Sequence, residues 1–115
     1  METYYDEIDD DILILVVDGG LNKGTAEELA TKIEQLVDVG LRKLIVDCSQ
    51  LNMITSSGLG VLVRIHNRMK AHDGDVKIAG VKSVLAQVLQ ITKLDSLFEF
   101  YPDVNRARLA FRPKG

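Results

Sequence analysis

Residues Ile12 to Val17 form an unbroken run of six apolar side chains, several of them β-branched. A strand with one face toward water alternates apolar and polar residues, so a continuous run indicates a strand that is buried on both faces. Strands of this kind belong to parallel sheets with helices packed on both sides. The run is also far shorter than the roughly 20 residues that a membrane helix needs. We therefore expect a layered α/β domain with no membrane insertion.

The rest of the chain alternates between strand and helix patterns. Further strands are predicted at residues 3–8, about 44–48, 76–81 and 98–101. Helices are predicted from Thr25 to about Gly40, from Gly58 to about Ala71, from Ser83 through Leu89 and from Pro102 to Phe111. Such alternation implies right-handed crossovers between parallel strands. We predict one α/β domain over residues 1–115, with a mostly parallel mixed sheet, about four helices and a frayed tail at 112–115.

Two of the predicted helix starts carry capping residues. Thr25 is followed three residues later by Glu28, which is the spacing of a capping box with Thr25 as the N-cap. Ser83 is the capping residue expected for the third helix.

The charge balance limits the kinds of partner. The chain has 14 basic and 17 acidic residues and a net charge of -3, without the basic excess of a nucleic-acid binder. Its first eleven residues are rich in acids, which is the wrong sign for a signal peptide. We expect a cytoplasmic protein that binds no nucleic acid.

Signals of catalysis are weak. His66 and His72 are the two histidines, and we expect both to face solvent on a helix without forming a metal site. Cys48 ends an apolar strand and is expected to be a buried structural thiol. The segment from Gly58 to Val63 begins like a dinucleotide fingerprint but lacks the third glycine. We predict no catalytic residue, metal or cofactor, and a protein that is not an enzyme.

The segment from Asn52 to Gly60 differs from the rest because three hydroxyl residues, Thr55, Ser56 and Ser57, meet two glycines where a helix begins. One hydroxyl is enough for an N-cap, which contributes about 1 kcal/mol. Glycine early in a helix costs up to about 1 kcal/mol relative to alanine. A bare helix N-terminus favours an anion, so a serine there can carry a phosphate. The alternative is an ordinary serine cap with glycines that admit a neighbouring loop.

Three segments resemble motifs of the STAS-domain family, and within it the bacterial anti-anti-sigma factors. The family motif of Asp-x-Ser, a short loop and Asp-Ser-Ser/Thr-Gly-Leu-Gly is similar to Asp47-Cys48-Ser49 and residues 55–60. The earlier element Gly-Glu-Leu-Asp-x-x-Thr-Ala-x-x-Leu is similar to residues 19–29, and Thr-x-Leu-Asp-x-x-Phe is similar to residues within 89–98. Their order matches the family over almost the whole chain.

The resemblance implies a domain that binds a serine-kinase anti-sigma factor, an ATPase of the histidine-kinase-like type, and so frees a sigma factor. The kinase ends this interaction by phosphorylating the serine after the family aspartate, which is Ser56 here, and a metal-dependent serine phosphatase resets it. The partner-binding residues expected around Ser56 are Asn22, Thr25, Thr55, Ser57, Gly58, Leu59 and Val63. Leu59 and Val63 lie off the main apolar stripe of their helix and are either an exposed contact patch or flanking core residues.

Two residues depart from the family pattern. Thr55 and Asn22 each stand where the family has aspartate, which bears on kinase recognition and rate. The alternative function is a STAS domain that binds a ligand or accompanies a transporter and is not phosphorylated. An enzyme of the nicotinamide type is contradicted by the absent catalytic residues.

Overall fold

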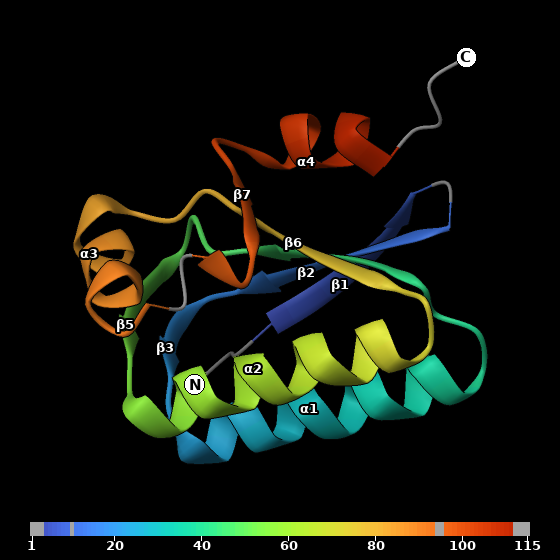
Figure 1. Cartoon of the computed structure of the whole chain (residues 1–115), viewed down its shortest axis with the longest axis horizontal. Coiled ribbons are helices and arrows are strands. Elements are labelled where there is room, and N and C mark those ends of the chain that lie inside the picture. The colour runs from blue at the N-terminus through green and yellow to red at the C-terminus, as the bar shows by residue number, and fades with distance from the viewer. Residues whose placement is uncertain (1–3, 10, 94–95, 112–115) are drawn as a thin grey trace.

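The computed structural model describes residues 4–9, 11–93 and 96–111. Its main sheet has five strands in the order β1-β2-β4-β6-β7; β1 and β2 are antiparallel, and the other neighbours are parallel (Figure 1). These strands are β1 (Tyr4–Asp9), β2 (Ile12–Val17), β4 (Lys43–Asp47), β6 (Asp75–Ala79) and β7 (Glu99–Tyr101). A second, parallel sheet contains two short strands, β3 (Gly19–Leu21) and β5 (Leu51–Ile54).

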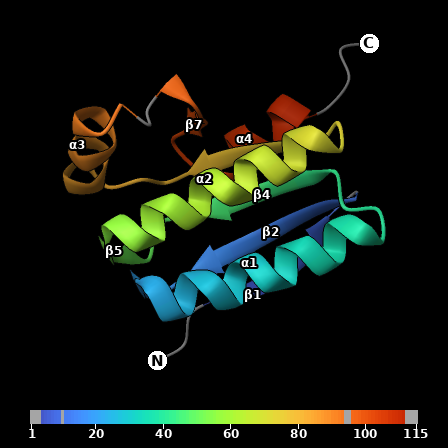
Figure 2. The ribbon, with the colours of Figure 1, turned by 60° about the horizontal axis from the view of Figure 1, so that its bottom comes forward.

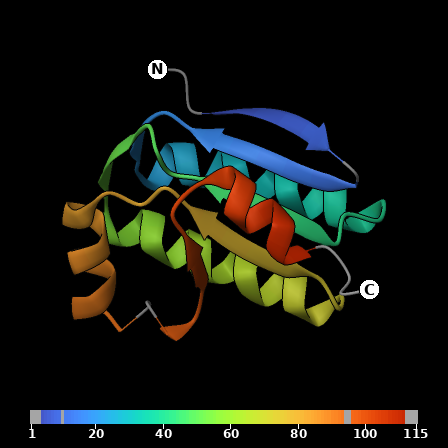
Figure 3. The same ribbon diagram turned by 90° about the horizontal axis from the view of Figure 1, so that it is seen from above.

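The helices of the described residues are α1 (Lys23–Asp38), α2 (Ser56–Ala71), α3 (Ser83–Ile91) and α4 (Val104–Phe111). α1 and α2 lie side by side on one face of the main sheet, while α4 covers the other face (Figures 2 and 3). The predicted fold class is confirmed: an α/β domain with a mostly parallel mixed sheet. The predicted tail at 112–115 and two residues of the C-terminal motif, Leu94 and Asp95, lie outside the described residues.

β2 is buried along its whole length, as its sequence predicts. Leu13, Leu15 and Val17 point into the large core beneath α1 and α2. Ile12 and Ile14 pack on the opposite face in a smaller core that includes Ala107 of α4. The continuous apolar run therefore reflects burial between two helical layers.

Two helix starts differ from the prediction. The N-cap of α1 is Asn22, whose Oδ1 accepts a hydrogen bond from the Thr25 backbone N–H at 3.0 Å. Thr25 completes the capping box from inside the helix, because its Oγ1 accepts from the Asn22 N–H, also at 3.0 Å. α3 begins at Ser83, and its N-cap is Lys82, which makes no side-chain capping bond. The strands β3 and β5 were not predicted either.

Lys77 is a charged residue in the interior of the sheet, with only 4% of its surface exposed. Its ammonium group forms ion pairs with Asp75 at 3.1 Å and with Glu99 at 2.7 Å. The same group lies 4.6 Å from the centre of the Phe111 ring. Because these partners belong to β6, β7 and α4, Lys77 links three elements, and its charge is balanced within the protein.

His66 is buried on α2, which corrects the prediction that it faces solvent; His72 is half-exposed. The His66 ring packs edge-to-face on Phe98, with centroids 5.1 Å apart. Its buried Nδ1 has no hydrogen-bond partner among the described residues. Burial lowers the pKa of His66, and the nearby Lys70 ammonium lowers it further, while Asp75 opposes the shift. The neutral imidazole is thus the form that fits this site.

We expect His66 to make the protein less stable in mild acid. The unfolded chain takes up a proton below its ordinary pKa of 6.5, whereas the folded chain resists protonation until a lower pH. Stability is therefore complete above that value and falls as the pH drops toward the folded pKa. Melting temperatures measured between about pH 7.5 and about pH 5.5 should fall less in His66→Leu than in the wild type. His72→Gln is the control and should keep the wild-type dependence; equal falls in all three proteins would contradict the assignment.

Candidate functional site

The short sheet of β3 and β5 brings the starts of two helices together. Leu21 pairs with Ile54 in parallel register, and each strand runs directly into a helix. Asn22 and Thr55, the next residue in each case, are the N-caps of α1 and α2. Both helices thus begin at the same edge of the molecule, where β3 and β5 reach them (Figure 1). These paired N-termini place the predicted residues from two distant parts of the sequence in one location.

Thr55 fixes the start of α2 through three backbone groups. Its Oγ1 accepts a hydrogen bond from the Gly58 N–H at 3.1 Å. Its own N–H donates to the Leu21 carbonyl at 3.0 Å, and its hydroxyl lies 3.4 Å from the same oxygen. The threonine hydroxyl is consequently occupied, and it supplies the cap that the alternative interpretation of the sequence gave to a serine.

Gly58 is required by the close approach of β3. A Cβ atom at this position would lie 2.4 Å from the Leu21 carbonyl oxygen and 3.2 Å from Cγ1 of Ile54. No such contact exists at Gly60, where a Cβ atom would meet nothing within 4 Å. Of the two interpretations of the glycines, the one in which they admit a neighbouring segment therefore holds for Gly58.

Ser56 and Ser57 are both exposed at the start of α2. Among the described residues, neither hydroxyl has a hydrogen-bond partner, in contrast to the hydroxyl of Thr55. The first turn of α2 contains no acidic residue, and neither does that of α1. Neither first turn therefore supplies a carboxylate to balance the partial positive charge at the N-terminus of its helix. An anion attached to Ser56 would meet a favourable potential.

Of the other predicted residues, Asn22, Thr25 and Val63 are half-buried, whereas Leu59 is buried. Asn22 and Thr25 are half-buried and cap α1 beside the start of α2. Val63 lies on α2, one turn after Leu59. Leu59 is only 6% exposed, so of the two alternatives, an exposed contact patch or a flanking core residue, the second holds for Leu59.

The thiol of Cys48 is buried and is not poised to act as a nucleophile. Cys48 is buried, as predicted, and burial followed by the charge of Asp47 raises the pKa of its thiol to about 12. At neutral pH the thiol is protonated and a poor nucleophile. No group of three or more potential metal ligands occurs within residues 4–9, 11–93 and 96–111. In the same part of the chain, no helix combines the length and apolar character needed to cross a membrane.

Comparison with known proteins gives a consistent family match. The model of the STAS domain matches residues 5–107. A curated relative from Bordetella bronchiseptica, provisionally named the anti-sigma factor antagonist BtrV, is 28% identical over 112 residues, which cover 97% of this chain and 96% of that protein.

Solved structures share the fold. A crystal structure from Thermotoga maritima, provisionally titled an anti-sigma factor antagonist, has a TM-score of 0.90 at 24% identity and covers 96% of this chain and 95% of that one. The anti-sigma factor antagonist SpoIIAA in its unphosphorylated form has a TM-score of 0.76 at 15% identity, over 94% of this chain and 96% of its own. The phosphorylated form, from Bacillus, has the same TM-score at 18% identity, over 96% and 100%.

Alanine substitutions at the two glycines of α2 test the close approach of β3. Gly58→Ala should lower the free energy of unfolding by about 1–3 kcal/mol, because the Leu21 carbonyl must move away. Gly60→Ala, in open space two residues later, should raise it by about 0.5–1 kcal/mol through helix propensity. Urea denaturation of both variants gives the comparison, and equal effects of the two substitutions would contradict it.

Proposed function

Because the chain belongs to the STAS-domain family, we propose that it is an anti-sigma factor antagonist controlled by phosphorylation of Ser56. The observation that carries the proposal is the exposed, unbonded hydroxyl of Ser56 at a helix N-terminus whose cap is already supplied by Thr55. The names of the Bordetella relative and of SpoIIAA support the antagonist function. The whole chain is taken as one STAS domain, although the family model matches residues 5–107.

The proposed cycle involves two other proteins. The unphosphorylated chain binds a serine-kinase anti-sigma factor, an ATPase of the histidine-kinase-like type, and so releases a sigma factor in the cytoplasm. Phosphorylation of Ser56 by that kinase ends the interaction, and a metal-dependent serine phosphatase restores it. The chain itself catalyses no reaction and serves as the substrate of the kinase.

The geometry favours Ser56 over its two hydroxyl neighbours. A phosphate on Thr55 would remove the acceptor of the Gly58 N–H bond and bring charge against the Leu21 carbonyl. Ser57 is exposed but lies one residue beyond the position that follows the family aspartate. Ser56 is the first residue of α2, where a phosphate can extend into solvent and still remain near the free N–H groups of the first turn.

The proposed partner surface combines both helix starts. Asn22 and Thr25 contribute from the start of α1, and Thr55, Ser57 and Val63 contribute from α2, while the buried Gly58 shapes the first turn beneath them. Leu59 has almost no exposed surface, so we assign it the task of holding the first turn of α2 against the domain. A partner that covers these residues also covers Ser56.

The two residues that stand where the family has aspartate, Asn22 and Thr55, are the N-caps of α1 and α2. Asparagine, threonine and aspartate all serve as N-caps, so exchanging an acid for a neutral residue preserves the cap. The exchange removes negative charge beside Ser56 at both helix starts. A phosphate at Ser56 therefore meets less repulsion here than between two aspartates, and a kinase that reads those acids finds neither.

Mass spectrometry of the intact protein tests the acceptor. Incubation with ATP and the serine-kinase anti-sigma factor of the same organism should add one phosphate to the wild type. Ser56→Ala should abolish the gain, whereas Ser57→Ala, the matched control one residue away, should keep it. Full phosphorylation of Ser56→Ala would overturn the assignment. If the wild type gains no phosphate, the alternative of a STAS domain that binds a ligand or accompanies a transporter is favoured.

Phosphorylation should change binding while leaving the fold intact. Phosphoserine adds about -1.5 to -2 charges, which a helix N-terminus favours by roughly 0.3–1 kcal/mol. A covering partner must instead desolvate that charge, and an unmatched charge at an interface commonly costs about 2–5 kcal/mol. Since about 1.4 kcal/mol is a factor of ten, affinity for the kinase should fall by more than tenfold.

The measurement is a titration of both forms against the isolated kinase, accompanied by thermal melts. Ser56→Asp should reproduce the direction with a smaller effect, because it carries one charge and a shorter side chain. Equal affinities of the two forms would remove the switch. A collapsed melt of the phosphorylated form would replace repulsion at the interface by unfolding as the mechanism.

A further inference from the structure

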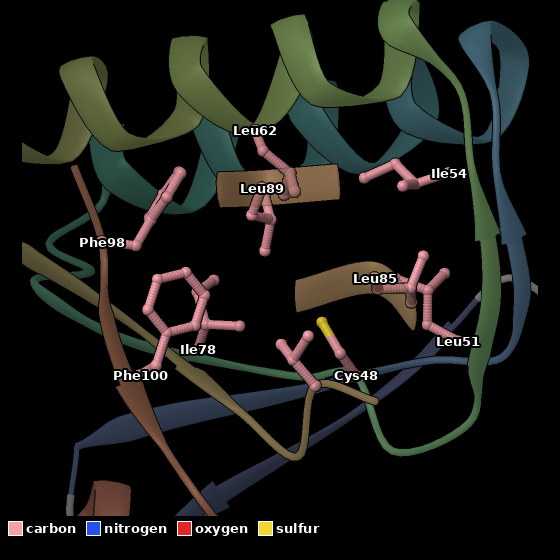
Figure 4. Close-up of a pocket in the computed structure, with 10 residues that line it drawn as sticks. Cys48, Leu51, Ile54, Leu62, Ile78, Leu85, Leu89, Phe98 and Phe100 are labelled. Atoms are coloured by element: carbon pink, nitrogen blue, oxygen red, sulfur yellow. The ribbon is translucent and has the colours of Figure 1, made fainter. Parts of the chain in front are cut away.

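An apolar space lies beneath α3, away from the exposed hydroxyls of Ser56 and Ser57. We call it the inner chamber; its volume is about 20 Å³. Figure 4 shows the labelled side chains surrounding it, with the sulfur of Cys48 pointing inward. The lining residues are Cys48, Leu51, Ile54, Leu62, Ile78, Val81, Leu85, Leu89, Phe98 and Phe100.

The inner chamber offers water nothing to bond with. A buried water makes two to four hydrogen bonds, and the lining exposes almost no polar surface. The Cys48 thiol is within 3.9 Å of the Val46 carbonyl, so its weak donor is directed to the backbone. Apolar spaces of this kind stay dry and bind apolar molecules.

A second hollow adjoins the inner chamber on the outside. This outer hollow has a volume of about 140 Å³ and is lined by Ala86, Leu89, Gln90 and Phe100. Leu89 and Phe100 line both spaces, so these two side chains form the wall between them. Phe100 is 37% exposed, and its ring packs edge-to-face on Phe98, with centroids 6.4 Å apart. A rotation of either side chain would join the two spaces into one close in size to the apolar cavities of roughly 150 Å³ that bind benzene.

α3 is attached in a way that permits this opening. Its N-cap, Lys82, forms no side-chain capping bond. Among its described side chains, Leu85 and Leu89 are the buried ones, and both line the inner chamber. The helix is therefore held over the chamber chiefly by the apolar contacts that an apolar ligand would replace.

We propose that the joined inner chamber and outer hollow form a binding site for a small apolar molecule, a hydrocarbon chain or ring that enters between Leu89 and Phe100. The lining contains no charged side chain, which excludes ions. Gln90, at the outer hollow, can meet one uncharged polar group at the outer end of the ligand. The proposal is independent of phosphorylation at Ser56.

Methyl NMR of the full-length chain with 1-hexanol and benzene as probes tests the site. Both probes should shift the methyl signals of lining residues such as Leu51, Ile78 and Leu85, with half-saturation on the order of 1 mM for ligands of so few atoms. The melting temperature should rise with probe concentration, because the probe binds the folded state. Tighter binding of hexanol than of benzene would identify a chain as the preferred class, and the reverse a ring.

Two controls make the test specific. Cys48→Met fills the inner chamber and should weaken both probes at least tenfold, while Ile91→Ala, on α3 but 81% exposed, should not. In wild-type protein, 1,6-hexanediol should bind at least tenfold more weakly than 1-hexanol, because its second hydroxyl finds no partner inside. This comparison holds even if Cys48→Met does not fold. Shifts that map elsewhere, no saturable binding, or equal affinities for the alcohol and the diol would overturn the proposal.

Discussion

The carbonyl group of Leu21 organises the candidate site. It accepts the Thr55 N–H at 3.0 Å and lies so close to α2 that only glycine fits at residue 58. One backbone oxygen thus joins the last residue of β3 to the first turn of a helix that starts 35 residues later in the chain. Together with the β3–β5 pairing, this contact places Asn22 and Thr55, the caps of two helices, side by side. The exposed hydroxyl of Ser56 therefore stands beside two helix N-termini whose first turns contain no acidic residue.

The predictable parts of the fold are those encoded by long or repetitive apolar patterns. Burial can be predicted from the sequence alone for the apolar run from Ile12 to Val17 and for the apolar stripes of α1 and α2. β3 and β5 do not, because strands of three and four residues depend on pairing with a distant segment. The same is true of His66, whose burial depends on Phe98, brought to it from 32 positions later in the chain. Local sequence cannot report a partner supplied by tertiary structure.

At the candidate site, the sequence predicts where the hydroxyl residues cluster, but it does not predict which hydroxyl caps the helix and which remain exposed. Asn22 and Thr25 are both capping residues three positions apart, and either could begin a helix. The β3–β5 pairing decides in favour of Asn22, because the chain leaves the sheet at Leu21. Likewise, Thr55 becomes the cap of α2 because Ile54 is the last paired residue. Ser56 is left exposed as a consequence, and so the tertiary pairing separates the capping hydroxyl from the free ones.

The strand β5 physically connects the two proposed sites. Leu51 and Ile54 line the inner chamber, and Ile54 is followed directly by Thr55 and Ser56. β5 has only four residues, and the hydrogen bond from the Thr55 N–H to the Leu21 carbonyl fixes the chain directly after it. In a densely packed domain, side chains that interdigitate with little free space hold such a short strand in place. One short strand thus places Leu51 and Ile54 at the chamber and Thr55 at the cap of α2, which is the helix that presents Ser56.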